Sequence, residues 1–161
     1  MSLSALLWVI LLTLTPTLEL RASIPYAIIG AGWSPTQAAV VGIGANILLA
    51  PLVWVFVEKM LRFFLDIQWI ARIYEKVAAK SVKRLEPKVE KYGIFGLALF
   101  IGVPFPGTGV YSGCLAASLL NFKFRHYMLA SMLGCVLAGV AVTLIVMSGD
   151  SALSFFIKGT H

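Results

Sequence analysis

The chain has 161 residues, of which 60% are hydrophobic and only 12% are charged, and its mean hydropathy is +0.92. Soluble domains carry about a quarter charged residues, spread over a surface that faces water, so this composition excludes a soluble globular domain. It predicts an all-α integral membrane protein of the cell membrane, with several membrane passes in a single domain, 1–161.

The charged residues divide the chain into two apolar halves and a connector. The first half, 1–57, contains only the charges Glu19 and Arg21. The connector, 58–91, holds nine basic and five acidic residues, a net charge of +4. The second half, 92–148, contains only the charges Lys123 and Arg125, and a tail, 149–161, follows it.

Each half contains one broken and one unbroken apolar stretch. A membrane-spanning helix needs about 20 apolar residues, and the segments 36–57 and 127–148 meet that requirement. The segment 3–31 is interrupted at 16–25 and the segment 93–120 at 102–113, because proline and glycine disfavour continuous helix. Backbone groups left open at membrane depth must be covered by protein or by a watery cavity.

The broken segments could each cross the membrane, which gives four spans, or turn back as re-entrant hairpins. Only the second arrangement places the basic connector and the loop around Lys123 on the same, cytoplasmic side, as the positive-inside rule requires. It also gives each half one hairpin and one transmembrane helix that enter from opposite sides. We therefore predict an inverted repeat, a plan found in transporters, with both termini outside the cell.

The connector 58–91 has apolar residues at steps of three or four and basic residues at most other positions. This pattern predicts a basic amphipathic helix on the cytoplasmic membrane surface, in contact with membrane lipids. No motif indicates nucleic-acid binding.

Glu19 and Arg21 fall inside the first break, and they are the principal candidate site. Ionisable groups at membrane depth normally pair, face a cavity, or mark a substrate or proton path. One interpretation is an internal ion pair that holds the tip of the hairpin. The other makes Arg21 the anchor for an anionic group such as phosphate or carboxylate, with Glu19 able to take up a proton. Two residues apart, they would point to different sides of a helix, but unwound chain would let both reach one cavity.

The remaining candidates carry no charge. The second break offers free backbone groups and the Thr108 hydroxyl, either in a tight turn or in a binding site. Asn46 is the one strongly polar side chain of the first crossing, and we expect it to bond between helices rather than to line a path. The full set of candidate lining residues is Pro16, Pro25, Asn46, Pro104, Pro106, Gly107, Thr108 and Gly109. No catalytic set, metal-ligand cluster or cofactor motif is apparent, so an enzyme is not expected.

Two motifs give the chain a family resemblance. Residues 16–21 read Pro-Thr-Leu-Glu-Leu-Arg, with Pro25 after them, and residues 104–109 read Pro-Phe-Pro-Gly-Thr-Gly. Together they resemble the small multidrug export protein family, a distant relative of the DedA membrane proteins. The resemblance implies two facing re-entrant hairpins, each followed by a transmembrane helix, and a transport role. The DedA relation implies lipid-carrier translocation that depends on proton gradients, with Glu19 and Arg21 at the acidic and basic positions of the first hairpin.

The functional prediction is a transporter or flippase for an amphipathic or lipid-linked anion such as a polyprenyl phosphate, with protons as a coupling ion. The alternatives are an exporter of small cationic drugs, and a membrane-shaping scaffold that acts through the basic connector. We also expect a homo-oligomer, because so short a chain has little protein with which to cover its broken backbone.

Overall fold

The computed structural model describes residues 2–16, 18–65, 93–104 and 107–158, and every regular element in these ranges is helical. The first half forms α1 (Leu3–Leu14), α2 (Glu19–Pro25), the π-helical turn η1 (Tyr26–Gly30) and α3 (Pro35–Leu65). The second half forms the helix Gly93–Gly102, then α5 (Val110–Leu119) and α6 (Phe124–Lys158). The expectation of an all-helical chain is confirmed for the described residues.

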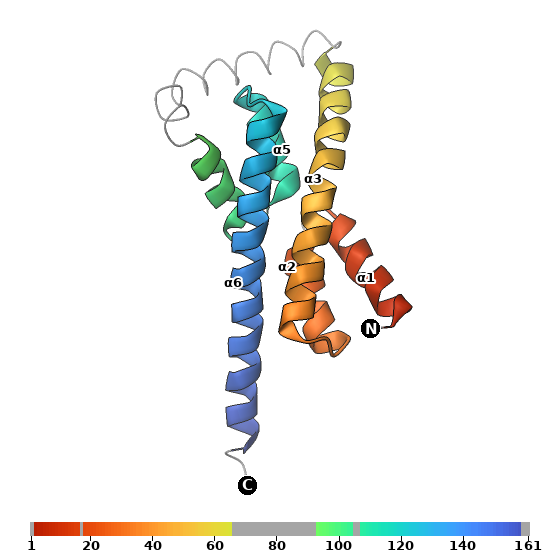
Figure 1. Ribbon diagram of the computed structural model, residues 1–161, viewed down its shortest axis with the longest axis vertical. Helices are drawn as coiled ribbons and strands as arrows, with labels where there is room; N and C mark the ends of the chain where they lie inside the picture. Colours follow the sequence, from red (N-terminus) through yellow and green to blue (C-terminus); the bar gives the residue numbers. More distant parts are fainter. Residues whose placement is uncertain (1, 17, 66–92, 105–106, 159–161) are drawn as a thin grey trace.

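The first predicted hairpin reverses its direction in the middle of the molecule. Ser2 is the N-cap of α1, since its hydroxyl oxygen accepts the Ala5 N–H at 3.3 Å. The helix ends shortly before Pro16, as expected because a proline disfavours helical backbone in the residue before it. Figure 1 shows α1 leading from the N-terminus to mid-height and α2 with η1 leading back to the same end.

The first break is shorter than predicted. The sequence indicated a break over 16–25, but α2 starts at Glu19 and contains Pro25, so that prediction is wrong from Glu19 onward. After Pro25 the helix widens into η1, in which the Ala31 N–H bonds to the Tyr26 carbonyl at 3.0 Å, one residue further along than in an α-helix. Pro25 has no N–H to donate to the preceding turn, so α2 loses one helical hydrogen bond at its last residue.

A capping box defines the start of α3. The Ser34 hydroxyl accepts the Gln37 N–H at 3.3 Å, while the Gln37 side chain accepts the Ser34 N–H at 3.4 Å. Pro35 occupies the first helical position, where its missing N–H has no helical partner in any case. The helix includes the predicted crossing 36–57 and continues to Leu65, into the first residues of the predicted connector.

The second half also contains two shorter helices followed by a long one. The helix Gly93–Gly102 leads to mid-height, α5 leads back, and α6 then runs the length of the molecule (Figure 1). Asn121, with φ 53°, ends α5 in a turn in which the Phe122 N–H bonds to the Ala117 carbonyl at 2.9 Å. Helix therefore occupies the ends of the predicted break 102–113, and α6 extends the predicted crossing 127–148 at both ends.

Glycines let the helices pack closely around the two breaks. A Cβ at Gly42 of α3 would lie 2.7 Å from the Ile24 side chain of α2. A Cβ at Gly134 of α6 would lie 2.7 Å from the Ile101 side chain and 2.8 Å from the Ala98 carbonyl oxygen. Neither glycine has room for a side chain, because atoms of a neighbouring helix of the same chain fill the space beside it.

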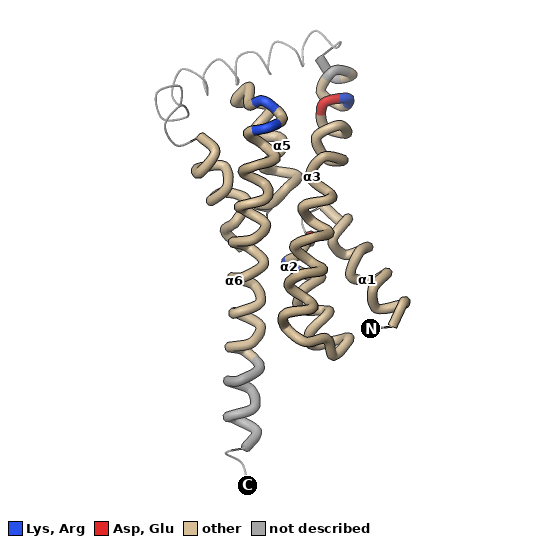
Figure 2. The backbone as a smooth tube through the Cα atoms, viewed as in Figure 1, with Lys and Arg blue, Asp and Glu red and all other residues tan. Residues whose placement is uncertain are grey.

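The outer surface is itself apolar. Large hydrophobic side chains remain exposed along α1, α3 and α6, including Leu48 at 74% and Leu144 at 58%, which is unusual for a protein in water. Two helical stretches, Pro35–Leu61 and Phe124–Gly149, are long and apolar enough to cross a membrane. In Figure 2, charged positions gather where α3 ends and α6 begins, at one end of the molecule. The predicted connector beyond residue 65 lies outside the described residues.

Candidate polar site between the two breaks

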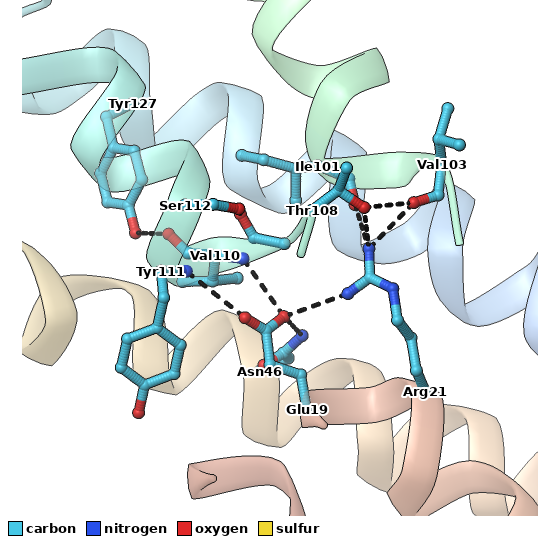
Figure 3. Close-up of polar contacts among 11 residues, drawn as sticks. Glu19, Arg21, Asn46, Ile101, Val103, Thr108, Val110, Tyr111, Ser112 and Tyr127 are labelled. Atoms are coloured by element: carbon cyan, nitrogen blue, oxygen red, sulfur yellow. Dashed lines mark hydrogen bonds and ion pairs between the residues drawn. The ribbon is translucent and has the colours of Figure 1, made fainter. Parts of the chain in front are cut away.

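The two breaks meet in the middle of the molecule, and Glu19 lies between them (Figure 3). Glu19 is only 1% exposed and is the first residue of α2, with φ 47° in the left-handed region. That conformation is uncommon for a residue with a side chain and costs energy. The packing of the two halves therefore holds this carboxylate in a specific position.

Four donors converge on the Glu19 carboxylate. Its Oε2 accepts hydrogen bonds from the Arg21 guanidinium at 3.4 Å, the Asn46 side-chain amide at 3.2 Å and the Val110 N–H at 3.2 Å. Its Oε1 accepts the Tyr111 N–H at 3.4 Å. Val110 and Tyr111 are the first two residues of α5, so the carboxylate satisfies N–H groups that have no partner within that helix.

Arg21 completes the arrangement at the other helix end of the second break. Its Nη2 donates to the carbonyl oxygens of Ile101 at 3.1 Å and Val103 at 2.9 Å, and to the Thr108 hydroxyl at 2.9 Å. Ile101 belongs to the last turn of the helix Gly93–Gly102 and Val103 follows that helix directly, and a cation is favourable at this C-terminal end. The first half thus supplies the Glu19 carboxylate to the helix that starts after the second break, and the Arg21 guanidinium to the helix that ends before it.

Two tyrosine hydroxyls connect the site to other elements. The Tyr111 hydroxyl donates to the Leu14 carbonyl at 2.7 Å, at the C-terminal end of α1. The Tyr127 hydroxyl is buried and lies 3.2 Å from the Val110 carbonyl and 3.4 Å from the Ala50 carbonyl. Its ring packs against Trp54, with 5.2 Å between the ring centroids. Both backbone polar groups of Val110 are therefore bound by side chains: its N–H by Glu19 and its carbonyl oxygen by Tyr127.

Gly109 leaves just enough room for the carboxylate. Its φ is 141°, a conformation that side chains rarely adopt, and a Cβ there would lie 2.5 Å from Glu19 Oε2. Glycine is required at this position both for the backbone and for the approach of the acid.

The structure brings together five of the residues that the sequence singled out: Glu19, Arg21, Asn46, Thr108 and Gly109. As expected, Asn46 bonds between helices. Of the other candidates, Pro25 is the last residue of α2, and Pro16, Pro104 and Gly107 are exposed at the breaks. Pro106 lies outside the described residues.

Sequence reasoning missed the backbone partners of the pair and both tyrosines. The missed groups are Ile101, Val103, Val110, Tyr111 and Tyr127. Backbone groups carry no residue-specific signal, so no motif could have indicated Ile101, Val103 or Val110. Tyr127 could have been noticed as a polar side chain close to the predicted loop around Lys123. Its partners, the Val110 and Ala50 carbonyls, could not have been identified from the sequence.

The Glu19–Arg21 cluster is largely shielded from solvent, and two of its buried polar atoms lack hydrogen-bond partners among the described residues. The side chain of Glu19 is 2% exposed and that of Arg21 is 12% exposed. Among the buried atoms of the described residues, Arg21 Nε and Asn46 Oδ1 have no hydrogen-bond partner. An apolar groove of about 200 Å³ between α1 and α3 is lined by residues adjacent to this region, among them Thr13, Leu14 and Ala45.

The donors of this cluster are arranged around a carboxylate, that of Glu19. Within the described residues, no group of three His, Cys, Asp or Glu side chains could hold a metal ion.

Comparison with known proteins identifies a family. Residues 19–141 match the family described as "Putative small multi-drug export protein"; the match begins at Glu19, directly after the first break, and includes the second break and about half of α6. Comparisons with curated proteins and with solved structures gave no match. The family match covers well over half of the chain and, with the two apolar helices, indicates a membrane protein of transport type. The chain belongs to the small multi-drug export protein family.

Proposed function

We propose that this protein exports a small amphipathic anion, with the Glu19–Arg21 cluster as its binding site. The observation that carries the proposal is the convergence of four donors on a single buried carboxylate. One donor is a guanidinium and two belong to a helix N-terminus, so the potential around the carboxylate is positive. The family description supports export as the activity.

A cation fits this site less well. Glu19 is the one described carboxylate of the cluster, and it is already engaged by four donors. A cationic compound would have to remove the carboxylate from these donors and would itself lie near Arg21. A negatively charged group instead matches the donors as they stand.

For the topology, we propose that α3 and α6 cross the membrane and that the two broken segments are re-entrant hairpins in an inverted repeat. The antiparallel course of α1 with α2, and of the helix Gly93–Gly102 with α5, supports this arrangement (Figure 1). The charged ends of α3 and α6 lie at the same end of the molecule, as the hairpin arrangement requires (Figure 2). Open backbone groups at both breaks have protein partners, which lipid could not supply.

Transport requires the cluster to open, because the Glu19 carboxylate is almost completely buried and the Arg21 side chain is only 12% exposed in this conformation. Protonation of Glu19 would remove the ion pair and weaken its bonds to α5, so a proton could drive the opening. The apolar groove between α1 and α3 adjoins the first break and suits the apolar part of an amphipathic compound.

The test compares two amphiphiles of equal chain length, an alkyl phosphate and an alkyl trimethylammonium, in liposomes that contain the purified protein. We expect flux of the phosphate in the unmodified protein and its loss in Arg21→Gln. If flux of the trimethylammonium compound is found instead, and is lost in Glu19→Gln but kept in Arg21→Gln, the protein is a cation exporter.

That cation exporter is the second candidate. Its support is the family description together with the burial of Glu19, since multidrug exporters that carry cations need an acidic group within the membrane.

A further inference from the structure

We propose that the Glu19 carboxylate is an internal stand-in for the transported anion, and that Glu19 and the anion occupy the same cradle in turn. The cradle consists of Arg21 Nη1, the Asn46 amide and the N–H groups of Val110 and Tyr111. This inference rests on the proposed function, because it assigns the way in which that site admits its substrate.

The cradle is a built anion site and more than a helix N-terminus. Two of its donors are side chains from other elements, and Asn46 is 1% exposed. The Asn46 Oδ1 has no hydrogen-bond partner among the described residues, which is costly for a buried polar atom. The amide is therefore held with its nitrogen toward the carboxylate at the expense of its oxygen. A carboxylate occupies the cradle in the structure itself (Figure 3).

Charge balance makes the occupancy exclusive. Arg21 supplies one positive charge and the α5 N-terminus a partial one, which a single anion neutralises. The titratable side chains around the cradle are Arg21 of α2, Tyr111 of α5, and Tyr127 and Cys135 of α6, and of these Arg21 alone carries a full charge at neutral pH. A second anion beside an ionised Glu19 would be repelled at short range in a poorly solvated site.

The substrate anion must therefore enter as Glu19 becomes neutral and leaves the cradle. Glu19 takes a proton from the adjoining aqueous side, and the anion takes over its four donors. When the anion leaves, Glu19 loses the proton and returns. Each anion is thus bound together with one proton, which Glu19 carries while the anion occupies the cradle, and the proton leaves with the anion.

A second consequence is that shortening Glu19 should leave a vacancy that an added acid can fill. Glu19→Ala lacks the atoms of acetate, and Glu19→Gly lacks those of propionate. Glycine also removes the strain of the left-handed backbone at this position. The control is Glu19→Gln, which retains the size of the side chain and leaves no vacancy.

The first experiment measures thermal unfolding of the variants in detergent with sodium acetate, sodium propionate or sodium chloride at equal ionic strength. We expect a saturable rise in melting temperature with acetate for Glu19→Ala and with propionate for Glu19→Gly. For Glu19→Gly, propionate should bind about fourfold more tightly than acetate, the effect of one buried methylene. Equal responses to both acids and to chloride, or a response in Glu19→Gln, would contradict the proposal.

The second experiment needs no cavity variant and so remains informative if these variants do not fold. Calorimetric titration of the unmodified protein with an alkyl phosphate, in two buffers of different ionisation enthalpy, should show uptake of about one proton per anion bound, and Glu19→Gln should show none. If the phosphate is transported but binds without proton uptake, the exchange is wrong and the proposed function survives. If the acids fill the vacancy but no anion is transported, the cradle exists and the proposed function is wrong.

Discussion

The hydroxyl group of Tyr111 donates a hydrogen bond to the carbonyl oxygen of Leu14 at 2.7 Å, although the two residues are 97 positions apart in the chain. Through this contact, a side chain of the second half binds a carbonyl group at the C-terminal end of α1. In the other direction, Glu19 and Arg21 close both helix ends of the second break. Each half therefore satisfies backbone groups that the other half leaves open.

Replacing Tyr111 with phenylalanine removes the hydroxyl and leaves the ring. We expect Tyr111→Phe to lower the free energy of unfolding by about 0.5–1.5 kcal/mol, the contribution of one hydrogen bond, in denaturation followed by circular dichroism. The matched control is Tyr26→Phe in η1, since the Tyr26 hydroxyl makes no hydrogen bond to the described residues. An equal loss in both variants would show that the contact with Leu14 does not contribute.

Two glycines with positive φ separate the effect of backbone strain from that of the Glu19 contact. Gly107→Ala and Gly109→Ala both force alanine into a strained conformation, with φ of 90° and 141°. Only at Gly109 would the new Cβ collide with the Glu19 carboxylate, because nothing lies within 4 Å of a Cβ at Gly107. We expect Gly109→Ala to abolish anion binding and Gly107→Ala to retain it, as measured by titration with an alkyl phosphate. Similar binding in both would mean that the carboxylate can move aside freely.

The Glu19–Arg21 pair should show strong energetic coupling. Removing one member of a buried pair leaves the other unpaired and costs about 3–5 kcal/mol, so Arg21→Gln and Glu19→Gln should each destabilise the protein strongly. The double variant should be less destabilised than the sum of the two, because neither charge is then left alone. Unfolding free energies of the three variants measure the coupling, and strict additivity would indicate that the 3.4 Å contact is energetically unimportant.

Single-cysteine labelling of intact cells tests the topology, in a background without Cys114 and Cys135. The hairpin arrangement predicts that the connector and the Lys123 loop are protected from an impermeant reagent and that the two termini react. The labelled positions are Ser2, Ser81, Lys123 and Thr160. Reaction at Lys123 without reaction at Ser81 would instead support four spans, with Glu19 and Arg21 in an ordinary kinked helix.

Much of the fold could be predicted from hydropathy and helix breakers alone. The limits of both broken segments and the presence of both long helices follow from where apolar runs start and stop. The narrowness of the breaks could not be predicted, because it depends on tertiary contacts. Glu19 adopts a strained φ that its four partners stabilise, and a π-turn follows Pro25 directly. Neither solution is visible in local propensity.

The site could be predicted only in part, for a similar reason. Glu19 and Arg21 were evident as isolated charges in an apolar half, and Asn46 and Thr108 as isolated polar side chains. Their spacing suggested that the pair would need unwound chain to reach one place. In fact the pair begins a helix and reaches the second break, where most of its partners are backbone groups more than 80 positions away. Long-range partners of that kind depend on the packing of the two halves.

The reciprocal closing of the breaks has a consequence for biosynthesis. When residues 1–57 have left the ribosome, the partners of Glu19 and Arg21 in 101–111 have not yet joined them in the membrane. The nascent first half then carries buried charges and open backbone groups, which lipid cannot satisfy. It can mature only after the second half has been inserted, so a truncated chain would be recognised as incomplete and degraded, and the two halves expressed as separate polypeptides would persist only together.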